Sequence, residues 1–232
     1  MNKRYAKYLL EKTISDYNKI AAKFSMTRQY LSSDILELKK YAANGDNILD
    51  LGCGNGRLSE LFTDLDIEYT GSDDSGELVK IAKTRYPKHH FIETSPLILP
   101  FPDDTFDKVF CLAVFHHIPS TELRLEYLAE VRRILKKDAL LILTVWDIWR
   151  KPGMFWQILK SGLFYPKLDL GDVFIPFKDG QGKIMANRYI HSYHDDELDK
   201  LFRESGFRVE TIEFQKRGKN DNGNILIVGK KY

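Results

Sequence analysis

The chain has 232 residues, of which 43% are hydrophobic, and it is long enough to bury one continuous core. It has no run of about 18 apolar residues and no apolar segment behind its basic start, so we expect neither a membrane-spanning helix nor a secretory signal. Cys53 and Cys111 are the only cysteines, which predicts a disulfide-free cytoplasmic protein in which both are small buried side chains.

The formal net charge of +2 is small, but the charges are unevenly distributed. Residues 1–44 carry nine Lys and Arg against four Asp and Glu, whereas residues 45–107 carry five against thirteen. Basic residues return after residue 150, including Lys216, Arg217 and Lys219 near the end of the chain. The basic segments suit a polyanionic partner, although ordinary solvated helix faces would give the same pattern.

Helical and strand-like patterns alternate along the chain. Apolar and charged residues recur at helical spacing over 4–24 and 28–43, and Asn44-Gly45 ends the second predicted helix. Strands are predicted near 47–51, 67–72, 89–93, 107–114, 139–146, 207–214 and 224–230, and helices over 57–64, 76–85, 121–136 and 195–205. This order predicts an α/β fold with a doubly wound, mostly parallel seven-stranded sheet that ends in an antiparallel hairpin.

The run over residues 47–57 is a short apolar strand that ends in an acid and is followed by glycines at alternate positions, Gly52, Gly54 and Gly56. Such glycines let the backbone approach a ligand in front of a helix N-terminus. Arg57 stands where a dinucleotide fingerprint has its third small residue. Asp50 suits a cationic ligand better than a pyrophosphate, and S-adenosylmethionine, with its ammonium and sulfonium groups, has that character.

A second predicted strand ends at Asp73, about 20 residues after the glycine loop. A carboxylate there accepts hydrogen bonds from both ribose hydroxyls of a nucleoside cofactor, including NAD, so Asp73 by itself leaves the cofactor open. Asp74 and Ser75 precede a predicted helix that begins at Gly76. Asp74 either joins the ribose site or caps this helix, and Ser75 is the better candidate for the cap.

The glycine loop resembles the first motif of the class I methyltransferases. The run Leu99–Val109 likewise resembles the L-P-F-x-D-x-x-F-D stretch before the fourth strand of many of them. This resemblance implies S-adenosylmethionine as cofactor, with the backbone at Leu112 facing it and with loop contacts from Gly52, Cys53, Gly54, Asn55 and Gly56. That family commonly has an adenine-binding Asp four residues before the L-P-F stretch. Here Ser95 takes that place, and its hydroxyl can still accept a hydrogen bond.

His116 and His117 end the fourth predicted strand, where we expect at least one of them beside the transferred methyl group. The alternative is a buried histidine with only a structural role. A metal site that combines this pair with His191 and His194 lacks a cysteine or a convincing carboxylate ligand, so we expect no metal. A serine hydrolase is excluded because the chain has no G-x-S-x-G elbow.

We expect a single domain with four parts. These are the N-terminal helices over 1–44, a cofactor-binding half over 45–146, an insertion over 147–193, and a C-terminal helix and hairpin over 194–232. The insertion breaks the strand–helix rhythm and is rich in Gly, Pro and aromatic residues, which argue against disorder. We interpret it as a lid or substrate-recognition module at the carboxyl edge of the sheet.

Several further motifs resemble the tRNA wobble-uridine carboxymethyl methyltransferases. The run Ile20–Arg28 is similar to their I-A-x-x-F-S-x-T-R motif, and Ala113–Thr121 and Val145-Trp146 also match. Arg188–His191 is similar to their R-Y-Y-H motif, although simple alternation along an edge strand gives the same residues. The resemblance covers about residues 14–230 and implies a tRNA substrate and a small zinc-binding activator protein.

The chemistry that this resemblance implies needs alignment and desolvation more than a base. A carboxymethyl group is already ionised at neutral pH, so forming its methyl ester removes no proton. Arg188, Tyr189 and His191 are the candidates for gripping the carboxylate, with His116 and His117 beside the methyl group. Tyr17 and Arg28 are assigned to the cofactor site, where Arg28 would hold the cofactor carboxylate or the substrate.

The sequence thus predicts an S-adenosylmethionine-dependent methyltransferase that esterifies a carboxymethyl group on a tRNA wobble uridine. Two alternatives remain open. The same glycine loop, Asp73 and L-P-F stretch occur in methyltransferases of small metabolites. A non-catalytic cofactor-binding RNA module is the second alternative, and Ser95 gives it slight support. The methyl acceptor, the need for an activator and the oligomeric state are left undecided by the sequence.

Overall fold

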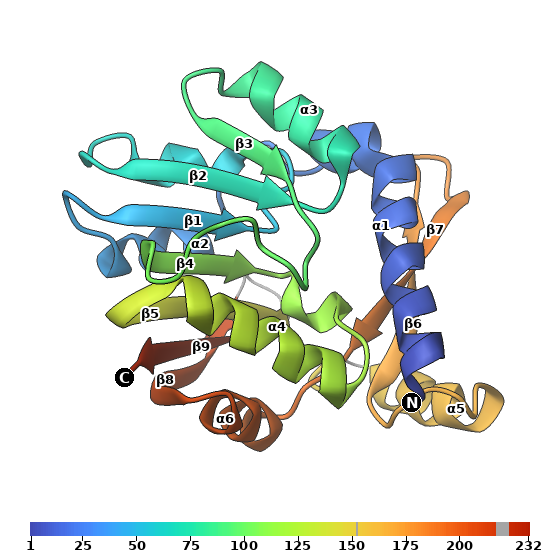
Figure 1. Cartoon of the computed structure of the whole chain (residues 1–232). Helices are drawn as coiled ribbons and strands as arrows, with labels where there is room; N and C mark the ends of the chain where they lie inside the picture. Colours follow the sequence, from blue (N-terminus) through green and yellow to red (C-terminus); the bar gives the residue numbers. More distant parts are fainter. Residues whose placement is uncertain (152, 217–222) are drawn as a thin grey trace.

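The computed structural model describes residues 1–151, 153–216 and 223–232. Its main sheet has seven strands in the order β3-β2-β1-β4-β5-β9-β8 (Figure 1). The first five strands in the chain pair in parallel: β1 (Asn47–Leu51), β2 (Glu68–Asp73), β3 (His90–Glu93), β4 (Phe106–Leu112) and β5 (Leu135–Trp146). The predicted mostly parallel, doubly wound sheet is therefore confirmed.

The last two strands, β8 (Phe207–Lys216) and β9 (Gly223–Lys231), form the predicted antiparallel hairpin. Strand β9 inserts between β5 and β8 and runs antiparallel to both. As a result, the beginning of β9 and the end of β8 lie at the same edge of the sheet as the carboxyl ends of the parallel strands. The turn between them, including Arg217 and Lys219, lies outside the described residues.

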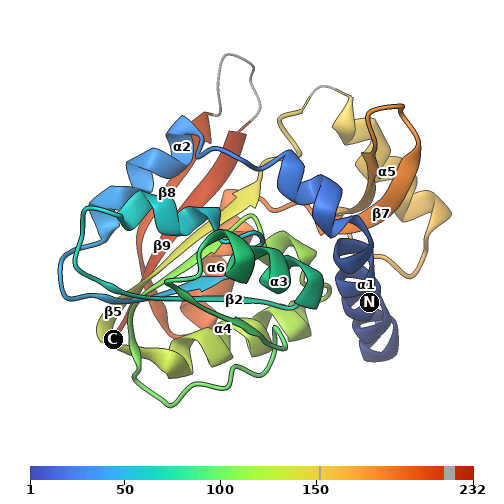
Figure 2. The ribbon, with the colours of Figure 1, turned by 90° about the horizontal axis from the view of Figure 1, so that it is seen from above.

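Successive side chains of each strand point to opposite faces of the sheet. Both faces are buried, because helices pack against each of them. One face packs against α4 (Thr121–Ile134) and α6 (Asp195–Glu204). The other face packs against three shorter elements, η1 (Glu37–Tyr41), η2 (Arg57–Phe62) and α3 (Gly76–Arg85). Figure 2 shows the layers from above.

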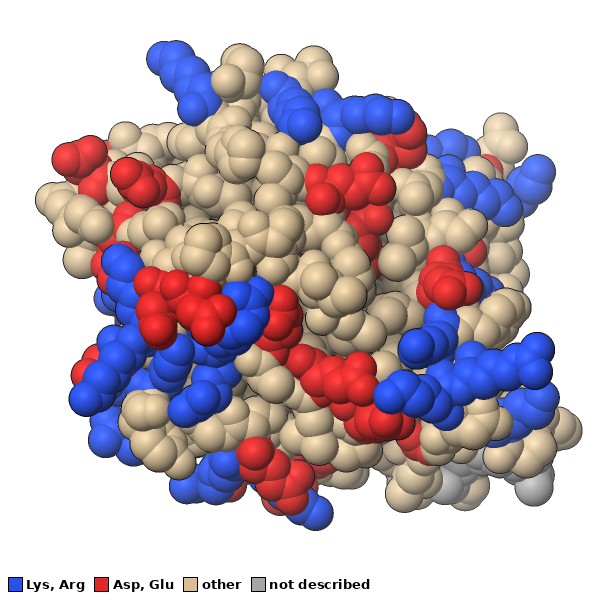
Figure 3. All heavy atoms as spheres, viewed as in Figure 1, with Lys and Arg blue, Asp and Glu red and all other residues tan. Residues whose placement is uncertain are grey.

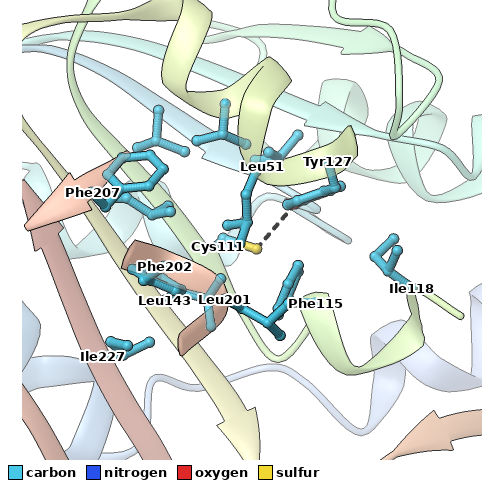
Figure 4. Packing of buried hydrophobic residues seen from close by; sticks show 14 of the residues in the cluster. Leu51, Cys111, Phe115, Ile118, Tyr127, Leu143, Leu201, Phe202, Phe207 and Ile227 are labelled. Atoms are coloured by element: carbon cyan, nitrogen blue, oxygen red, sulfur yellow. Dashed lines mark hydrogen bonds between the residues drawn. The ribbon is translucent and has the colours of Figure 1, made fainter. Parts of the chain in front are cut away.

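Figure 4 shows the first of these cores around Cys111, whose Sγ lies 3.1 Å from Oη of Tyr127. Burial raises the pKa of the Cys111 thiol to about 12, so the thiol is uncharged at neutral pH. Cys53 is also buried and free, and burial raises its pKa well above the usual value. Both cysteines are small buried side chains without a disulfide, as the sequence predicted.

The predicted helix over 28–43 is wrong in its first part. After α1 (Lys3–Met26), the chain forms only the short α2 (Ser33–Leu36) and η1 before β1. In the preceding turn, the backbone carbonyl of Arg28 accepts a hydrogen bond from Nδ2 of Asn55 at 2.9 Å. The backbone carbonyl of Tyr30 accepts one from the side chain of Arg57 at 2.7 Å. These tertiary bonds replace the helical ones, so propensity does not decide the local structure.

The insertion after β5 is more regular than its composition suggests. It contains α5 (Met154–Phe164) and a separate two-stranded antiparallel sheet of β6 (Asp172–Lys178) and β7 (Ile184–His191). Its own small core includes Ile158, Val173 and Ile190. Strand β7 contacts α1, so the insertion lies beside the first helix and not over the main sheet (Figure 1). Within the described residues, no helix is long and apolar enough to span a membrane.

Candidate active site

The glycine loop joins β1 to η2 and is hydrogen-bonded to the end of β2. The backbone N–H groups of Gly52 and Cys53 both donate to the carbonyl of Ser72, at 2.7 and 2.9 Å. Gly52 has a φ of +82°, and a Cβ there would lie 2.2 Å from Cγ2 of Val114. Only glycine fits this position, for both conformational and steric reasons. The loop therefore turns sharply and leaves its backbone open to a cavity.

This cavity lies at the carboxyl edge of the parallel strands, where open α/β sheets bind ligands. It brings together most of the residues that the sequence assigned to the cofactor: Tyr17, Arg28, Asp50, Gly52, Cys53, Gly54, Asn55, Asp73, Asp74 and Leu112. His117 also lines it. Six other assigned residues are not among the lining residues: Gly56, Ser95, His116, Arg188, Tyr189 and His191.

Asp73 is buried at the end of β2, with both carboxylate oxygens bonded to the backbone. Oδ2 accepts from the N–H of Gly54 at 2.8 Å, and Oδ1 accepts from that of Ser75 at 2.9 Å. Asp73 thus fixes the glycine loop as well as facing the cavity. Burial raises the pKa of Asp73 and of the adjacent Asp74. Ser75 caps α3 through its hydroxyl, and Asp74 lines the cavity without capping that helix.

Asp50 is another buried carboxyl group in the cavity. Its Oδ2 accepts from the hydroxyl of Tyr69 at 2.6 Å, and only 2% of the residue is exposed. Burial raises the pKa of Asp50 to about 7. A cation bound nearby would favour the ionised form of this carboxyl group.

Asn55 and Arg28 connect the glycine loop to the end of α1. Nδ2 of Asn55 donates to Oγ of Ser25 at 3.1 Å and to the carbonyl of Arg28 at 2.9 Å. The amide of Asn55 therefore anchors the segment that carries the F-S-x-T-R motif. The Arg28 side chain lines the cavity and lies 5.3 Å from the ring centre of Phe24.

Tyr17 and His117 form a contact between α1 and η3 (Phe115–His117), a short helical turn after β4. The two histidines therefore follow the fourth strand, whereas the sequence had predicted that they end it. The Tyr17 hydroxyl lies 2.9 Å from Nε2 of His117, whose Nδ1 lies 2.7 Å from the carbonyl of Tyr189. Because a carbonyl only accepts, Nδ1 carries the proton and Nε2 accepts from Tyr17. Burial lowers the pKa of His117 to about 4, so the ring is neutral at physiological pH. It orients the Tyr17 hydroxyl at the cavity wall.

His116 has a different environment from its neighbour. Its Nδ1 accepts from the backbone N–H of Trp146 at 3.3 Å, and its fully buried ring packs against those of His117 and Trp146. Burial lowers the pKa of His116 well below its usual value. The pair is therefore divided, with His117 lining the cavity and His116 packed behind it.

Side chains alternate along β7, so the residues of the R-Y-x-H segment point to two different sides of this strand. Arg188 faces the rings of Trp146 and Phe177, with its guanidinium carbon 5.1 and 5.5 Å from their centres. Arg188 is only 5% exposed, and within the described residues its Nε has no hydrogen-bond partner. Its charge also acts on Tyr17, where it opposes the rise in pKa that burial causes. Arg188 thus lies next to the Tyr17–His117 pair.

Tyr189 and His191 point to the other side of β7, into a buried polar network. The Tyr189 hydroxyl and Nδ1 of His191 lie 2.7 and 2.6 Å from Oδ1 of Asp172, and Nε2 of His191 lies 2.9 Å from Glu197. Arg124 of α4 lies 3.7 and 3.6 Å from the same two carboxylates. The structure does not bring Tyr189 and His191 together with Arg188. Their side chains hold β7 against α4 and α6.

Ser95 lies in an exposed loop, where its Oγ accepts from the N–H of Leu97 at 3.4 Å. The neighbouring Thr94, which the sequence reasoning did not assign, lines the cavity and is 8% exposed. Its place directly after β3 is the signal that would have identified it. Ala113 was also missed. It lines the cavity with a φ of +58°, a strained value for a residue with a Cβ.

The lining residues fit S-adenosylmethionine. The buried carboxyl groups of Asp50 and Asp73 and the partly exposed one of Asp74 suit its ammonium and sulfonium charges and its ribose hydroxyls. Leu112 and the glycine backbone offer apolar and close-approach surfaces to the rest of the molecule. When bound, this cofactor supplies a methyl group activated by the sulfonium. Within the described residues, no cluster of His, Cys, Asp or Glu side chains is arranged to hold a metal ion.

Comparisons with known proteins indicate the same class of enzyme. Residues 49–143 match the family described as "Methyltransferase domain". The tRNA (carboxymethyluridine(34)-5-O)-methyltransferase of Schizosaccharomyces pombe is 29% identical over 203 residues, covering 82% of this chain and 86% of the relative. The Saccharomyces cerevisiae and Mus musculus proteins of this name are 32% and 33% identical over 57% and 56% of this chain. The matched segments cover only 47% and 19% of those two relatives.

Solved structures show the same fold. A methyltransferase from Methanosarcina mazei, described as SAM-dependent, is 23% identical with a TM-score of 0.73, over 84% of this chain and 96% of that chain. A methyltransferase structure from Haloferax volcanii, solved in complex with the activator Trm112, is 18% identical with a TM-score of 0.68, over 94% and 96% of the two chains.

The sheet order, the glycine loop with its carboxylates and the matched domain define a class I methyltransferase that uses S-adenosylmethionine. The matched domain covers residues 49–143 of this chain, and the surrounding fold is that of this class. Within it, the sequence is similar to the tRNA carboxymethyluridine methyltransferases at 29–33% identity.

Proposed function

We propose that this enzyme transfers the methyl group of S-adenosylmethionine to the carboxymethyl group of a tRNA wobble uridine. A carboxylate oxygen forms a bond to the methyl carbon as the bond from that carbon to sulfur breaks, and S-adenosylhomocysteine leaves uncharged. No proton is transferred, so the reaction requires alignment and not a base. The similarity to the named relatives supports the choice of substrate.

Arg188 is the structural observation that carries this proposal. Its buried guanidinium has a side-chain hydrogen bond with Tyr17, but within the described residues its Nε has no partner and can still bind an anionic group. Arg188 lies next to Tyr17, which lines the cofactor cavity. A substrate carboxylate held by Arg188 would therefore lie next to that cavity. The planar guanidinium matches a carboxylate through two parallel hydrogen bonds.

Tyr189 and His191 would act as positioning residues and not as direct contacts. Their network with Asp172 and Glu197 fixes β7, and the carbonyl of Tyr189 orients His117. Although burial alone would raise the pKa of Glu197, the hydrogen bond with His191 lowers it.

The surface of the insertion supports an RNA partner. Helix α5 exposes Trp156 and Phe164, with 66% and 71% of each residue accessible, and the basic Lys160 and Lys167 are exposed in the same segment. Exposed aromatic rings stack on unpaired bases, and lysines contact phosphates. The face drawn in Figure 3 is a mosaic of both charge signs, with acidic groups between basic ones. We therefore place the RNA contact at the insertion.

Two further parts of the proposal concern partner and location. A small zinc-binding activator would bind this enzyme, as Trm112 binds the Haloferax volcanii methyltransferase of similar fold. Co-expression with such a protein would then raise activity above that of the chain alone. The enzyme would work in the cytoplasm, in keeping with its two free cysteines.

The test uses S-adenosylmethionine labelled in its methyl group, with tRNA that carries carboxymethyluridine and with a small-molecule extract as a parallel acceptor. We expect label in the tRNA as a methyl ester, released as methanol by mild alkali. Alkali-stable label in tRNA would contradict esterification. Label only in the extract would favour a small-metabolite methyltransferase, and cofactor binding without transfer to either acceptor would favour a non-catalytic RNA module.

A further inference from the structure

The cofactor cavity extends beyond β5 to the last two strands, where it is lined by buried polar groups without partners. Gln215 of β8 is 6% exposed, and within the described part of the chain neither Nε2 nor Oε1 has a hydrogen-bond partner. Asp34 of α2 is 4% exposed, and its Oδ1 is likewise unpartnered among the described residues. Buried amide and carboxylate atoms are usually hydrogen-bonded, so these atoms are candidates to bind a polar ligand.

The sheet and α2 fix the positions of these side chains. Trp146, Asn224 and Gln215 are register partners across β5, β9 and β8, so they lie in a row on one face of the sheet. Nδ2 of Asn224 donates to Oδ2 of Asp34 at 3.1 Å. That bond leaves Oδ1 of Asp34 as the atom available to a ligand. The arrangement is built before any ligand binds.

The cofactor does not explain this end of the cavity. Asp73 lies at the end of β2, and Gln215 lies on β8, five strands away in the order β2-β1-β4-β5-β9-β8. At the usual spacing between strands, this is a separation of about 24 Å. A nucleoside whose ribose is bound at Asp73 does not reach Gln215. The polar end is therefore available to the methyl acceptor.

We propose that Gln215 and Asp34 form the subsite that binds the uracil edge of the acceptor. This inference rests on the proposed function and specifies how its substrate is recognised. The amide of Gln215 offers one donor and one acceptor side by side, which pair with a carbonyl oxygen and the N3–H of a uracil ring. Oδ1 of Asp34 accepts a hydrogen bond from a nucleoside hydroxyl. Arg188, with its guanidinium carbon 5.1 Å from the ring centre of Trp146, would hold the carboxymethyl group.

The test measures binding of two anticodon stem-loop RNAs to the protein saturated with S-adenosylhomocysteine. One RNA carries 5-carboxymethyluridine, and the other carries the same base methylated at N3, which removes the donor. We expect N3-methylation to weaken binding to the native protein by about 10- to 100-fold. Gln215→Met should remove this discrimination, whereas Gln29→Leu at an exposed position should keep it.

The same variants separate recognition from folding. Because the amide of Gln215 is buried and unpaired without ligand, Gln215→Met should keep or raise the melting temperature and leave the affinity for S-adenosylhomocysteine unchanged. Asp34→Asn should weaken binding of both RNAs while retaining their ratio. A lower melting temperature for Gln215→Met would show that this side chain serves the fold and would count against the subsite.

Activity and recognition can fail independently in this experiment. If the native protein methylates tRNA but binds the two RNAs equally, the subsite is wrong and the proposed function stands. If it discriminates between the RNAs but transfers no methyl group, the subsite stands and the proposed function is wrong. If it binds neither RNA, both proposals are overturned.

Discussion

The hydroxyl of Tyr17 lies 2.9 Å from Nε2 of His117, which joins the first helix to η3, the turn after β4, at the cofactor cavity. His117 is in turn fixed by the carbonyl of Tyr189, at 2.7 Å from Nδ1. Three segments far apart in the sequence therefore meet at one neutral imidazole. The contact couples the insertion to the cofactor cavity, with the charged Arg188 next to it.

Tyr17→Phe should lower methyl transfer because it removes the hydroxyl and leaves Nε2 of His117 unpaired in a buried site. A lost hydrogen bond of this kind costs about 1–3 kcal/mol, which corresponds to about a 5- to 150-fold loss of kcat/KM. Steady-state kinetics with tRNA would measure it. The matched control is Tyr8→Phe, because Tyr8 lies on the same helix and is 55% exposed. Equal losses in the two variants would contradict a specific role for the pair.

Arg188→Ala should reduce methyl transfer sharply while the affinity for S-adenosylhomocysteine stays near native, because Arg188 does not line the cofactor cavity. Arg188→Lys should recover only part of the activity, since an ammonium lacks the two-donor fork that matches a carboxylate. Kinetics and calorimetric titration together would measure both effects. An Arg188→Ala enzyme as active as the native one would rule out the proposed binding of the substrate carboxylate by Arg188. Arg150→Ala, at an exposed arginine, is the control.

Asp73→Ala should weaken cofactor binding by about 1–3 kcal/mol, because it leaves the N–H groups of Gly54 and Ser75 without an acceptor and frees the glycine loop. Calorimetry with S-adenosylmethionine and S-adenosylhomocysteine would measure the loss, and NAD should not bind the native protein. Asp64→Ala, at an exposed carboxylate, should leave the affinity unchanged. Unaltered affinity in Asp73→Ala, or binding of NAD, would contradict the assignment.

Stability should depend on pH through Asp50. Its pKa is about 7 in the folded protein against 3.8 as the reference value, so the folded state favours the protonated form. The stabilisation is therefore complete below about pH 4 and is lost as the pH rises through about 7, by an amount on the order of 2–4 kcal/mol. Denaturant unfolding at several pH values would measure it, and Asp50→Asn should flatten the dependence.

Cofactor affinity should show the opposite trend, because a bound cation favours the ionised carboxylate. Binding of S-adenosylmethionine should strengthen as the pH rises from about 5 to 8, with contributions from Asp50 and from the raised pKa values of Asp73 and Asp74. In Asp50→Asn, the part of this dependence that belongs to Asp50 should disappear. A native affinity that is constant across this range would show that these carboxyl groups do not contact the cation.

Much of the fold could be predicted from the sequence, because hydrophobic alternation and turn residues are local signals. The strand ends at Asp50 and Asp73 are one example. Carboxyl ends of parallel strands meet at one edge of the sheet, so both acids were expected near the glycine loop, and both line the cavity there. The terminal hairpin was predicted on similar grounds. The segment after α1 could not be predicted, because tertiary bonds from Asn55 and Arg57 determine its conformation.

The arrangement of the proposed substrate residues was decided only by the tertiary structure. Alternation along β7 separates Arg188 from Tyr189 and His191, but the sequence does not say which face of the strand lies toward the cavity. The partners that settle this, Trp146 on one side and Asp172 on the other, belong to other strands. Asp34 and Asn224 likewise meet across 190 positions of the chain. Local patterns encode elements and their buried faces, whereas contacts between distant side chains depend on how those elements pack.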